Sequence, residues 1–136
     1  VTIARAANPE LTVALDLTAE WDKVSEAGSL VQGCVVVRKA FADEHPNEVK
    51  AFLDEYKASI EFLTAEPEQA GQMIQDAGIF AKAAVAAKAI PNCNVCFVSG
   101  AEMQAPLTAF LTALSTVAPQ SIGGSVPGDD FYCVLK

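Results

Sequence analysis

The stretch from Gly33 to Leu63, GCVVVRKAFADEHPNEVKAFLDEYKASIEFL, changes its hydrophobic pattern partway along. Its first part, Cys34 to Val37, contains three consecutive valines and is too short for a helix, which predicts a buried strand. From Asn47 on, apolar residues recur at helical spacing and charged residues occupy the opposite face, which predicts an amphipathic helix. The apolar positions are Val49, Phe52, Leu53, Tyr56, Ile60 and Leu63. A strand followed by a helix of this kind is a unit of an α/β sheet.

Segments on both sides extend this pattern. Short apolar runs predict two more strands, and proline, glycine and capping residues mark further helices. We therefore expect a three-layer α/β fold that is helix-rich with few strands, in which the strand from Cys34 to Val37 is buried on both faces. The other expected strands are 11–17 and 95–98; the expected helices are 18–24, 67–78, 81–90 and a last helix to Val117, opened by a capping box of Ser99 and Glu102.

Composition limits the classes of partner. The chain has 136 residues, of which 51% are hydrophobic, so residues 1–136 can bury a core as a single domain or as a piece of a larger one. The net charge is −8 and no basic cluster occurs, which argues against nucleic acid as a partner. The first residues, Val1 to Ala7, resemble the end of a helix rather than a signal peptide. We expect an upstream half to be absent from this sequence.

Few residues carry chemistry. His45 is the one histidine and has no partner at a defined spacing, so we expect it at the surface with no catalytic role. Cys93 and Cys96 form a C-x-x-C pair, but no second pair follows at the spacing of a zinc site. We therefore expect no metal and no cofactor. Cys34 is predicted to be a buried free thiol, whereas Cys93, Cys96 and Cys133 leave open one disulfide if the protein is exported.

A polar loop precedes the expected central strand. Ligands of open α/β sheets bind near strand ends, which makes this loop the best place in the sequence for a binding site. We predict that Ser29 and Gln32 contact a ligand and that Trp21 forms a wall of the site. An ordinary connecting loop is the competing interpretation.

Several segments together resemble a known family. They are VVVRKAFADEHPNEVKAFLDEYKASIEFLTAEPEQA, AKAAVAAKAIPNCNV, GAEMQAPLTAFLTAL and the terminal SIGGSVPGDDFY. This order is similar to the C-terminal part of type II solute-binding proteins of ABC importers. The most similar group, which is called NMT1-like, binds nitrate, sulfonates, taurine and thiamine-pyrimidine precursors.

The resemblance implies that the chain is part of one lobe of a two-lobed periplasmic-binding-protein fold. It further implies a non-enzymatic role, in which the protein captures a small solute and delivers it to an ABC permease in the membrane. The expected location is periplasmic or extracellular, with a lipoprotein anchor in Gram-positive bacteria. Without its other half, the chain is expected to bind solute poorly and to associate with a second copy as a homodimer.

Two alternative functions stay open at this point. Fungal thiamine-pyrimidine synthases have a similar fold and use a histidine, but His45 matches none of their motifs. The ligand-sensing domain of a bacterial transcription regulator is also similar and would require a helix-turn-helix upstream. The residues that carry the resemblance are structural, so they leave the identity of the solute open.

Overall fold

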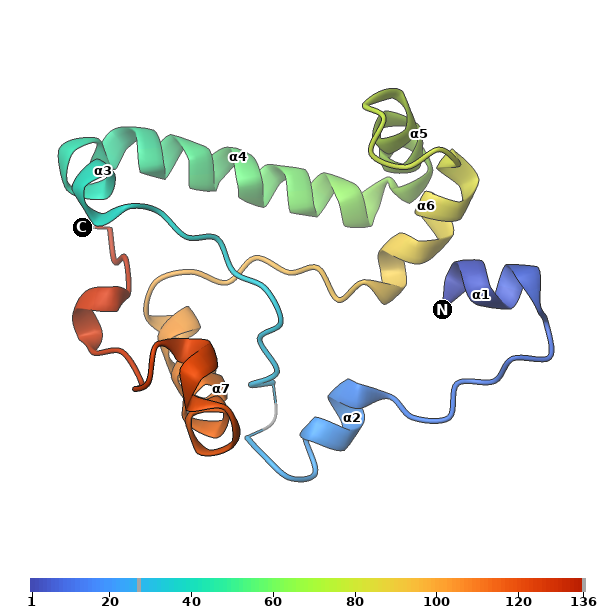
Figure 1. Cartoon of the computed structure of the whole chain (residues 1–136). Coiled ribbons are helices and arrows are strands. Elements are labelled where there is room, and N and C mark those ends of the chain that lie inside the picture. Colours follow the sequence, from blue (N-terminus) through green and yellow to red (C-terminus); the bar gives the residue numbers. More distant parts are fainter. Residues whose placement is uncertain (27, 136) are drawn as a thin grey trace. The chain divides into compact units, whose positions relative to one another are not determined.

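The computed structural model describes residues 1–26 and 28–135 of the chain, and its regular elements are helices (Figure 1). Helical residues make up 60% of the chain, and the described residues contain no strand. The α-helices are α1 (Thr2–Ala7), α2 (Leu17–Trp21), α3 (Lys39–Glu44), α4 (Pro46–Ala65), α5 (Pro67–Asp76), α6 (Ala83–Ala89) and α7 (Ala101–Val117). The 3₁₀-helices are η1 (Ile90–Asn92), η2 (Pro119–Ile122) and η3 (Asp129–Phe131).

The predicted three-layer α/β fold is therefore wrong, because a layered α/β fold requires a sheet and none forms in residues 1–26 and 28–135. None of the three predicted strands forms. The residues Leu11 to Asp16, Cys34 to Val37 and Val95 to Val98 have no regular structure, and Leu17 is the first residue of α2. Instead of being buried on both faces, Val36 is 77% exposed. β-Branched residues favour strands only where a neighbouring strand supplies backbone partners and side-chain contacts. The valines at 35–37 have no neighbouring strand in the described residues, so their strand propensity produces no strand.

The structure consists of two compact units, which we describe separately. The first unit comprises Val1–Ala14 and Lys50–Phe97, and its centre is the contact between α5 and α6. Ala70 and Gly71 of α5 are buried there, as is Ala86 of α6. A methyl group on Gly71 would lie 2.5 Å from the carbonyl oxygen of Ala83 and 3.0 Å from the backbone nitrogen of Ala87. The missing side chain of Gly71 therefore lets the two helices approach closely.

The predicted limits of α5 are confirmed closely. Pro67 occupies the first turn, where its missing N–H has no helical partner to lose. The helix ends at Asp76, and Gly78 then adopts the left-handed conformation with φ +69°. The side chain of Gln75 accepts a hydrogen bond of 2.8 Å from the backbone N–H of Ala83, at the start of α6. This bond satisfies an N–H that the helix cannot satisfy internally.

The long helix α4 confirms the amphipathic pattern of the central stretch. Its residues from Lys50 on belong to the first unit. Phe52 stacks on Tyr56 at a centroid distance of 5.7 Å, and Tyr56 meets the edge of Phe97 at 6.2 Å. Ile60 is buried, but Phe52 is 51% exposed, so the apolar stripe of α4 is only partly covered.

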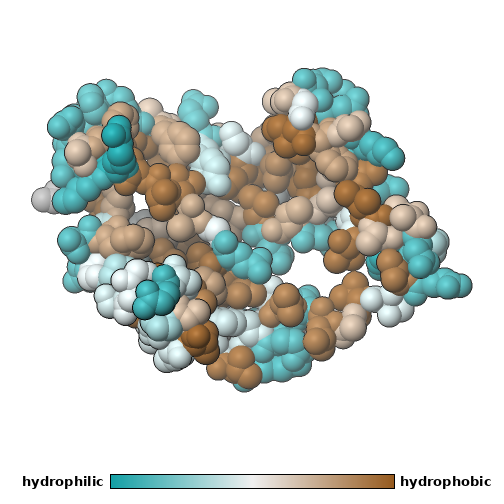
Figure 2. Space-filling model, in the orientation of Figure 1, coloured by the Kyte–Doolittle hydropathy of each residue, from teal (hydrophilic) through white to brown (hydrophobic). Residues whose placement is uncertain are grey.

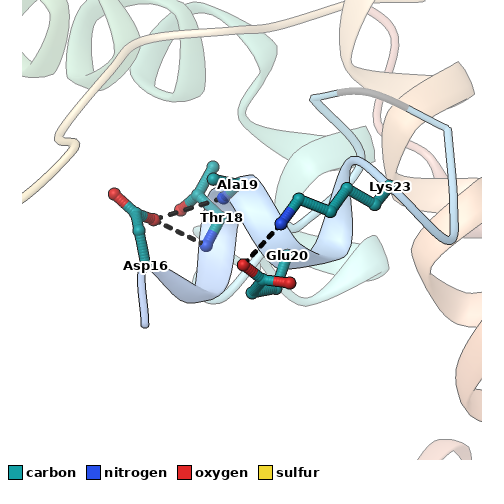
Figure 3. A network of polar contacts seen from close by, with 5 residues as sticks. All are labelled: Asp16, Thr18, Ala19, Glu20 and Lys23. Atoms are coloured by element: carbon teal, nitrogen blue, oxygen red, sulfur yellow. Dashed lines mark hydrogen bonds and ion pairs between the residues drawn. The ribbon is translucent and has the colours of Figure 1, made fainter. Parts of the chain in front are cut away.

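The second unit comprises Leu15–Val49 and the chain from Val98 on. It begins with the short helix α2, which was expected over 18–24 and starts one residue earlier, after the N-cap Asp16. The Asp16 carboxylate accepts hydrogen bonds from the backbone N–H groups of Thr18 and Ala19 at 2.9 and 3.2 Å (Figure 3). Lys23 forms a surface ion pair with Glu20 at 2.6 Å. Aspartate is a strong N-cap, so this carboxylate fixes where α2 starts.

The longest element of the second unit is α7, which packs against η2. It begins after Gly100 with no side-chain cap, so the predicted capping box of Ser99 and Glu102 does not form. Pro106 lies inside the helix, and Leu107 next to it is buried. Large apolar side chains are exposed in both units, and Figure 2 shows hydrophobic residues in brown over much of the visible face.

We predict that Gly71→Ala destabilises the protein, although alanine is the better helix former by about 1 kcal/mol. The added methyl group meets backbone atoms of α6 that cannot rotate away, and such overpacking costs about 1–3 kcal/mol. The measurement is the urea midpoint of the helical circular dichroism signal. Gly33→Ala is the matched control, because a methyl group there meets nothing within 4 Å. An unchanged midpoint for Gly71→Ala would contradict the close contact of α5 with α6.

Candidate functional site

A groove with a volume of about 710 Å³ lies on one face of α7 in the second unit. This volume is in the range of small-molecule sites, which is about 300–1,000 Å³. Residues of α7 form its floor, and two residues that follow α2 form one wall. The lining residues are Ser25, Glu26, Ala101, Gln104, Ala105, Thr108, Ala109, Thr112, Ala113 and Thr116.

The floor of the groove follows from a regular spacing in α7. Alanines recur at every fourth position from Ala101 to Ala113, and threonines recur at every fourth position from Thr108 to Thr116. Residues four apart lie on the same face of a helix, so these two rows form one face of small side chains with hydroxyl groups. The hydroxyl of Thr112 donates to the carbonyl oxygen of Thr108 at 2.8 Å. Small side chains leave the volume above this face open.

The wall at Ser25 and Glu26 is held from beneath by Ser29, which is fully buried. The Ser29 hydroxyl donates to the carbonyl oxygen of Glu26 at 2.6 Å, and the Ser29 backbone N–H donates to the same oxygen at 3.1 Å. Asp22 also accepts a hydrogen bond from the backbone N–H of Gly28 at 3.0 Å. These bonds fix the backbone on either side of the wall.

Trp21 connects this wall to the floor. Its indole Nε1–H donates to Ser29 Oγ at 2.8 Å, and its ring lies against Phe110 of α7 at a centroid distance of 5.5 Å. Trp21 is partly buried, and Ser29 supplies the hydrogen-bond partner that its N–H needs there. The pair therefore links the segment after α2 to α7 through one apolar contact and one hydrogen bond.

Two residues of the floor also hold the C-terminal segment. Gln104 Nε2 donates to Asp129 Oδ1 at 3.0 Å, and the hydroxyls of Thr108 and Tyr132 share a hydrogen bond of 2.7 Å. Tyr132 is buried, so its hydroxyl bond is protected from water. Through these bonds η3 and the residue after it are anchored on α7.

The chemistry of the groove is that of a binding site for a polar molecule. Glu26 is the one lining residue with a formal charge, and the remaining polar groups are hydroxyls and one amide. Ions of negative charge are disfavoured beside a carboxylate, whereas amine groups are favoured. Among the residues that the structure describes, no group of three or more His, Cys, Asp and Glu could hold a metal ion.

The structure brings together two of the three predicted ligand-binding residues. Trp21 and Ser29 form the hydrogen bond described above and lie behind the wall of the groove. Gln32 is exposed in the extended segment that follows and is not among the lining residues. Contact of these three residues with a solute stays a prediction.

The remaining chemical residues lie at the surface. His45 follows α3, and its ring packs tilted against Phe41 at a centroid distance of 4.8 Å. Its Nδ1 lies 3.6 Å from Glu48 Oε1. All four cysteines are free thiols and exposed, so the predicted burial of Cys34 is wrong. That prediction depended on the strand, and it fails for the same reason.

Sequence reasoning did not find the groove. The spacing of Ala101, Ala105, Ala109 and Ala113 is visible in the sequence, and it could have indicated a helix face without large side chains. The wall, in contrast, depends on a bond between residues eight positions apart and on their contact with α7. No local pattern predicts that contact.

Comparison of the chain with protein-family models, curated proteins and solved structures finds no match. No helix among the described residues has both the length and the apolar character needed to cross a membrane.

We predict that Trp21→Phe destabilises the protein by about 1–2 kcal/mol, because the buried Ser29 hydroxyl loses a hydrogen-bond donor while the aromatic contact is kept. The measurement is urea denaturation of the wild type, Trp21→Phe, Ser29→Ala and the double variant. If the bond couples the two residues, the double variant is more stable than the sum of the single effects predicts. Strict additivity would contradict the proposed link between the wall and the floor.

Proposed function

We propose that this chain is part of a solute-capturing protein of an ABC-type importer and that it holds a small polar solute in the groove on α7. The observation that carries the proposal is this groove, which is open to water, has a volume in the range of small-molecule sites and is lined by alanine methyl groups and hydroxyl side chains. The resemblance of the sequence to solute-binding proteins indicates the same class, but the sheet that it implies is absent from the described residues. Delivery of the solute to a membrane permease is the role that this class implies.

The charge of the groove favours some solutes of this class over others. Glu26 attracts an ammonium or amino group and repels nitrate and simple sulfonates. Taurine carries an ammonium group, and thiamine-pyrimidine compounds carry an amino group on an aromatic ring. The hydroxyl oxygens of Thr112 and Thr116 supply acceptors for the rest of such a molecule, because their protons are donated to the carbonyl oxygens of Thr108 and Ala113. We therefore assign an amine-bearing solute to the groove.

We predict weak, millimolar binding of taurine and of an aminopyrimidine, and no binding of nitrate. The affinity is low because the groove is open to water on one side and buries only part of a ligand. The measurement is a titration followed by amide nitrogen and proton chemical shifts, which detects weak binding and locates it. Shifts are expected at Ala105, Thr108 and Thr112.

Two variants test the location and the charge. Ala105→Leu fills the groove and is expected to abolish binding, whereas Ala58→Leu places the same side chain on an exposed alanine of α4 and is expected to leave binding unchanged. Glu26→Gln removes the charge and is expected to weaken the binding of both amines several-fold. Shifts that cluster away from α7, or equal binding of nitrate and taurine, would refute the proposal.

A further inference from the structure

Two segments of the chain are extended and without backbone partners over most of their length. We call residues 10–16, Glu-Leu-Thr-Val-Ala-Leu-Asp, the acidic segment, and residues 33–39, Gly-Cys-Val-Val-Val-Arg-Lys, the basic segment; Glu10 lies in a turn and Lys39 is the first residue of α3. Backbone groups from Thr12 to Leu15 and from Gln32 to Val37 make no backbone hydrogen bond within the described part of the chain. A row of unpaired N–H and C=O groups in an extended chain is a template for pairing with another strand.

The side chains of both segments favour such pairing. Leu11, Val13 and Leu15 alternate with Thr12 and Ala14, so the apolar residues of the acidic segment point to one side. In the basic segment Val35 and Val37 share one side. All five of these large apolar side chains are exposed: the fractions are 44% for Leu11, 55% for Val13, 63% for Leu15, 48% for Val35 and 39% for Val37.

The charges at the ends of the segments are complementary. The acidic segment begins with Glu10 and ends with Asp16, whereas Arg38 and Lys39 end the basic segment. In an antiparallel pair with Glu10 opposite Arg38, Leu11 lies opposite Val37 and Val13 opposite Val35. Leu11, Val13, Val35 and Val37 then share one face, and Glu10 meets Arg38 on the other face, while Asp16 lies opposite Gln32. Two basic segments paired with each other would leave Arg38 without a counter-ion.

We infer that two copies of this chain form a dimer in which the acidic segment of each copy pairs with the basic segment of the other. When both pairs form between the same two copies, they are related by a two-fold axis, and this axis closes the dimer. Each pair satisfies backbone groups that are exposed in the single chain and covers apolar side chains on one face. The inference is independent of solute binding in the groove.

The test is sedimentation velocity of the whole chain over a wide concentration series, with Glu10→Arg, Arg38→Glu and the double variant. The wild type is expected to shift from the mass of one chain to that of two as concentration rises. Each single variant is expected to weaken the dimer by roughly two- to fivefold, and the double variant to restore it. All three variants change exposed residues, so folding is not at risk.

Net charge alone predicts a different result. Glu10→Arg changes the net charge from −8 to −6 (−8 + 2), which would strengthen association if general repulsion decided it. Glu55→Arg makes the same change on an exposed residue of α4 and is the matched control, expected not to weaken the dimer. Infrared amide I spectra are expected to gain a strand band as the dimer forms.

Three outcomes would overturn the inference. The first is a chain that stays monomeric at every concentration. The second is equal weakening by Glu10→Arg and Glu55→Arg, or a double variant that does not recover. The third is a strand band that is independent of concentration, because the segments would then pair within one chain.

Discussion

The backbone of each helix is hydrogen-bonded within its own segment, whereas the backbone of an extended segment must bond to water or to a neighbouring strand. This difference determines which parts of the chain have regular structure. Helices such as α4 and α7 satisfy their backbone hydrogen bonds locally, and each then needs only one covered face to be stabilised. The run from Cys34 to Val37 cannot bond its own backbone groups to one another, and it is extended and exposed.

Within each unit, small side chains decide where helices can come close or leave room. Gly71 allows α5 to approach the backbone of α6, and a methyl group there would collide with Ala83 and Ala87. On α7 the alanines have the opposite effect, because among the described residues of the second unit no other helix lines the space above them and a groove results. The wall of that groove is held by Trp21 and Ser29, so its shape depends on one buried hydrogen bond and one aromatic contact.

Sequence reasoning succeeded where the signal was local. The amphipathic spacing predicted α4, and Pro67 and Gly78 predicted the limits of α5, since each acts through its own backbone. The strands failed because the β propensity of three valines says nothing about whether a neighbouring strand exists. In the candidate site, Trp21 and Ser29 are brought together as a linked pair, but the groove itself was missed. Its wall and floor come from segments far apart in the sequence. Local sequence patterns do not show that these segments come into contact when the chain folds.

Electrostatic interactions act both at the groove and between the acidic and basic segments. The chain carries −8 overall, and Glu26 gives the groove the same sign, whereas Arg38 and Lys39 make the basic segment positive. Two copies repel each other through their net charge, but Glu10 and Arg38 attract locally. Salt screens both terms over a distance of about 8–10 Å. Because the net repulsion acts over longer distances than the local pair, moderate salt removes more of the repulsion than of the attraction. Salt does not screen apolar burial or backbone hydrogen bonding, so these two interactions supply most of the free energy of association. The charges determine which segments pair.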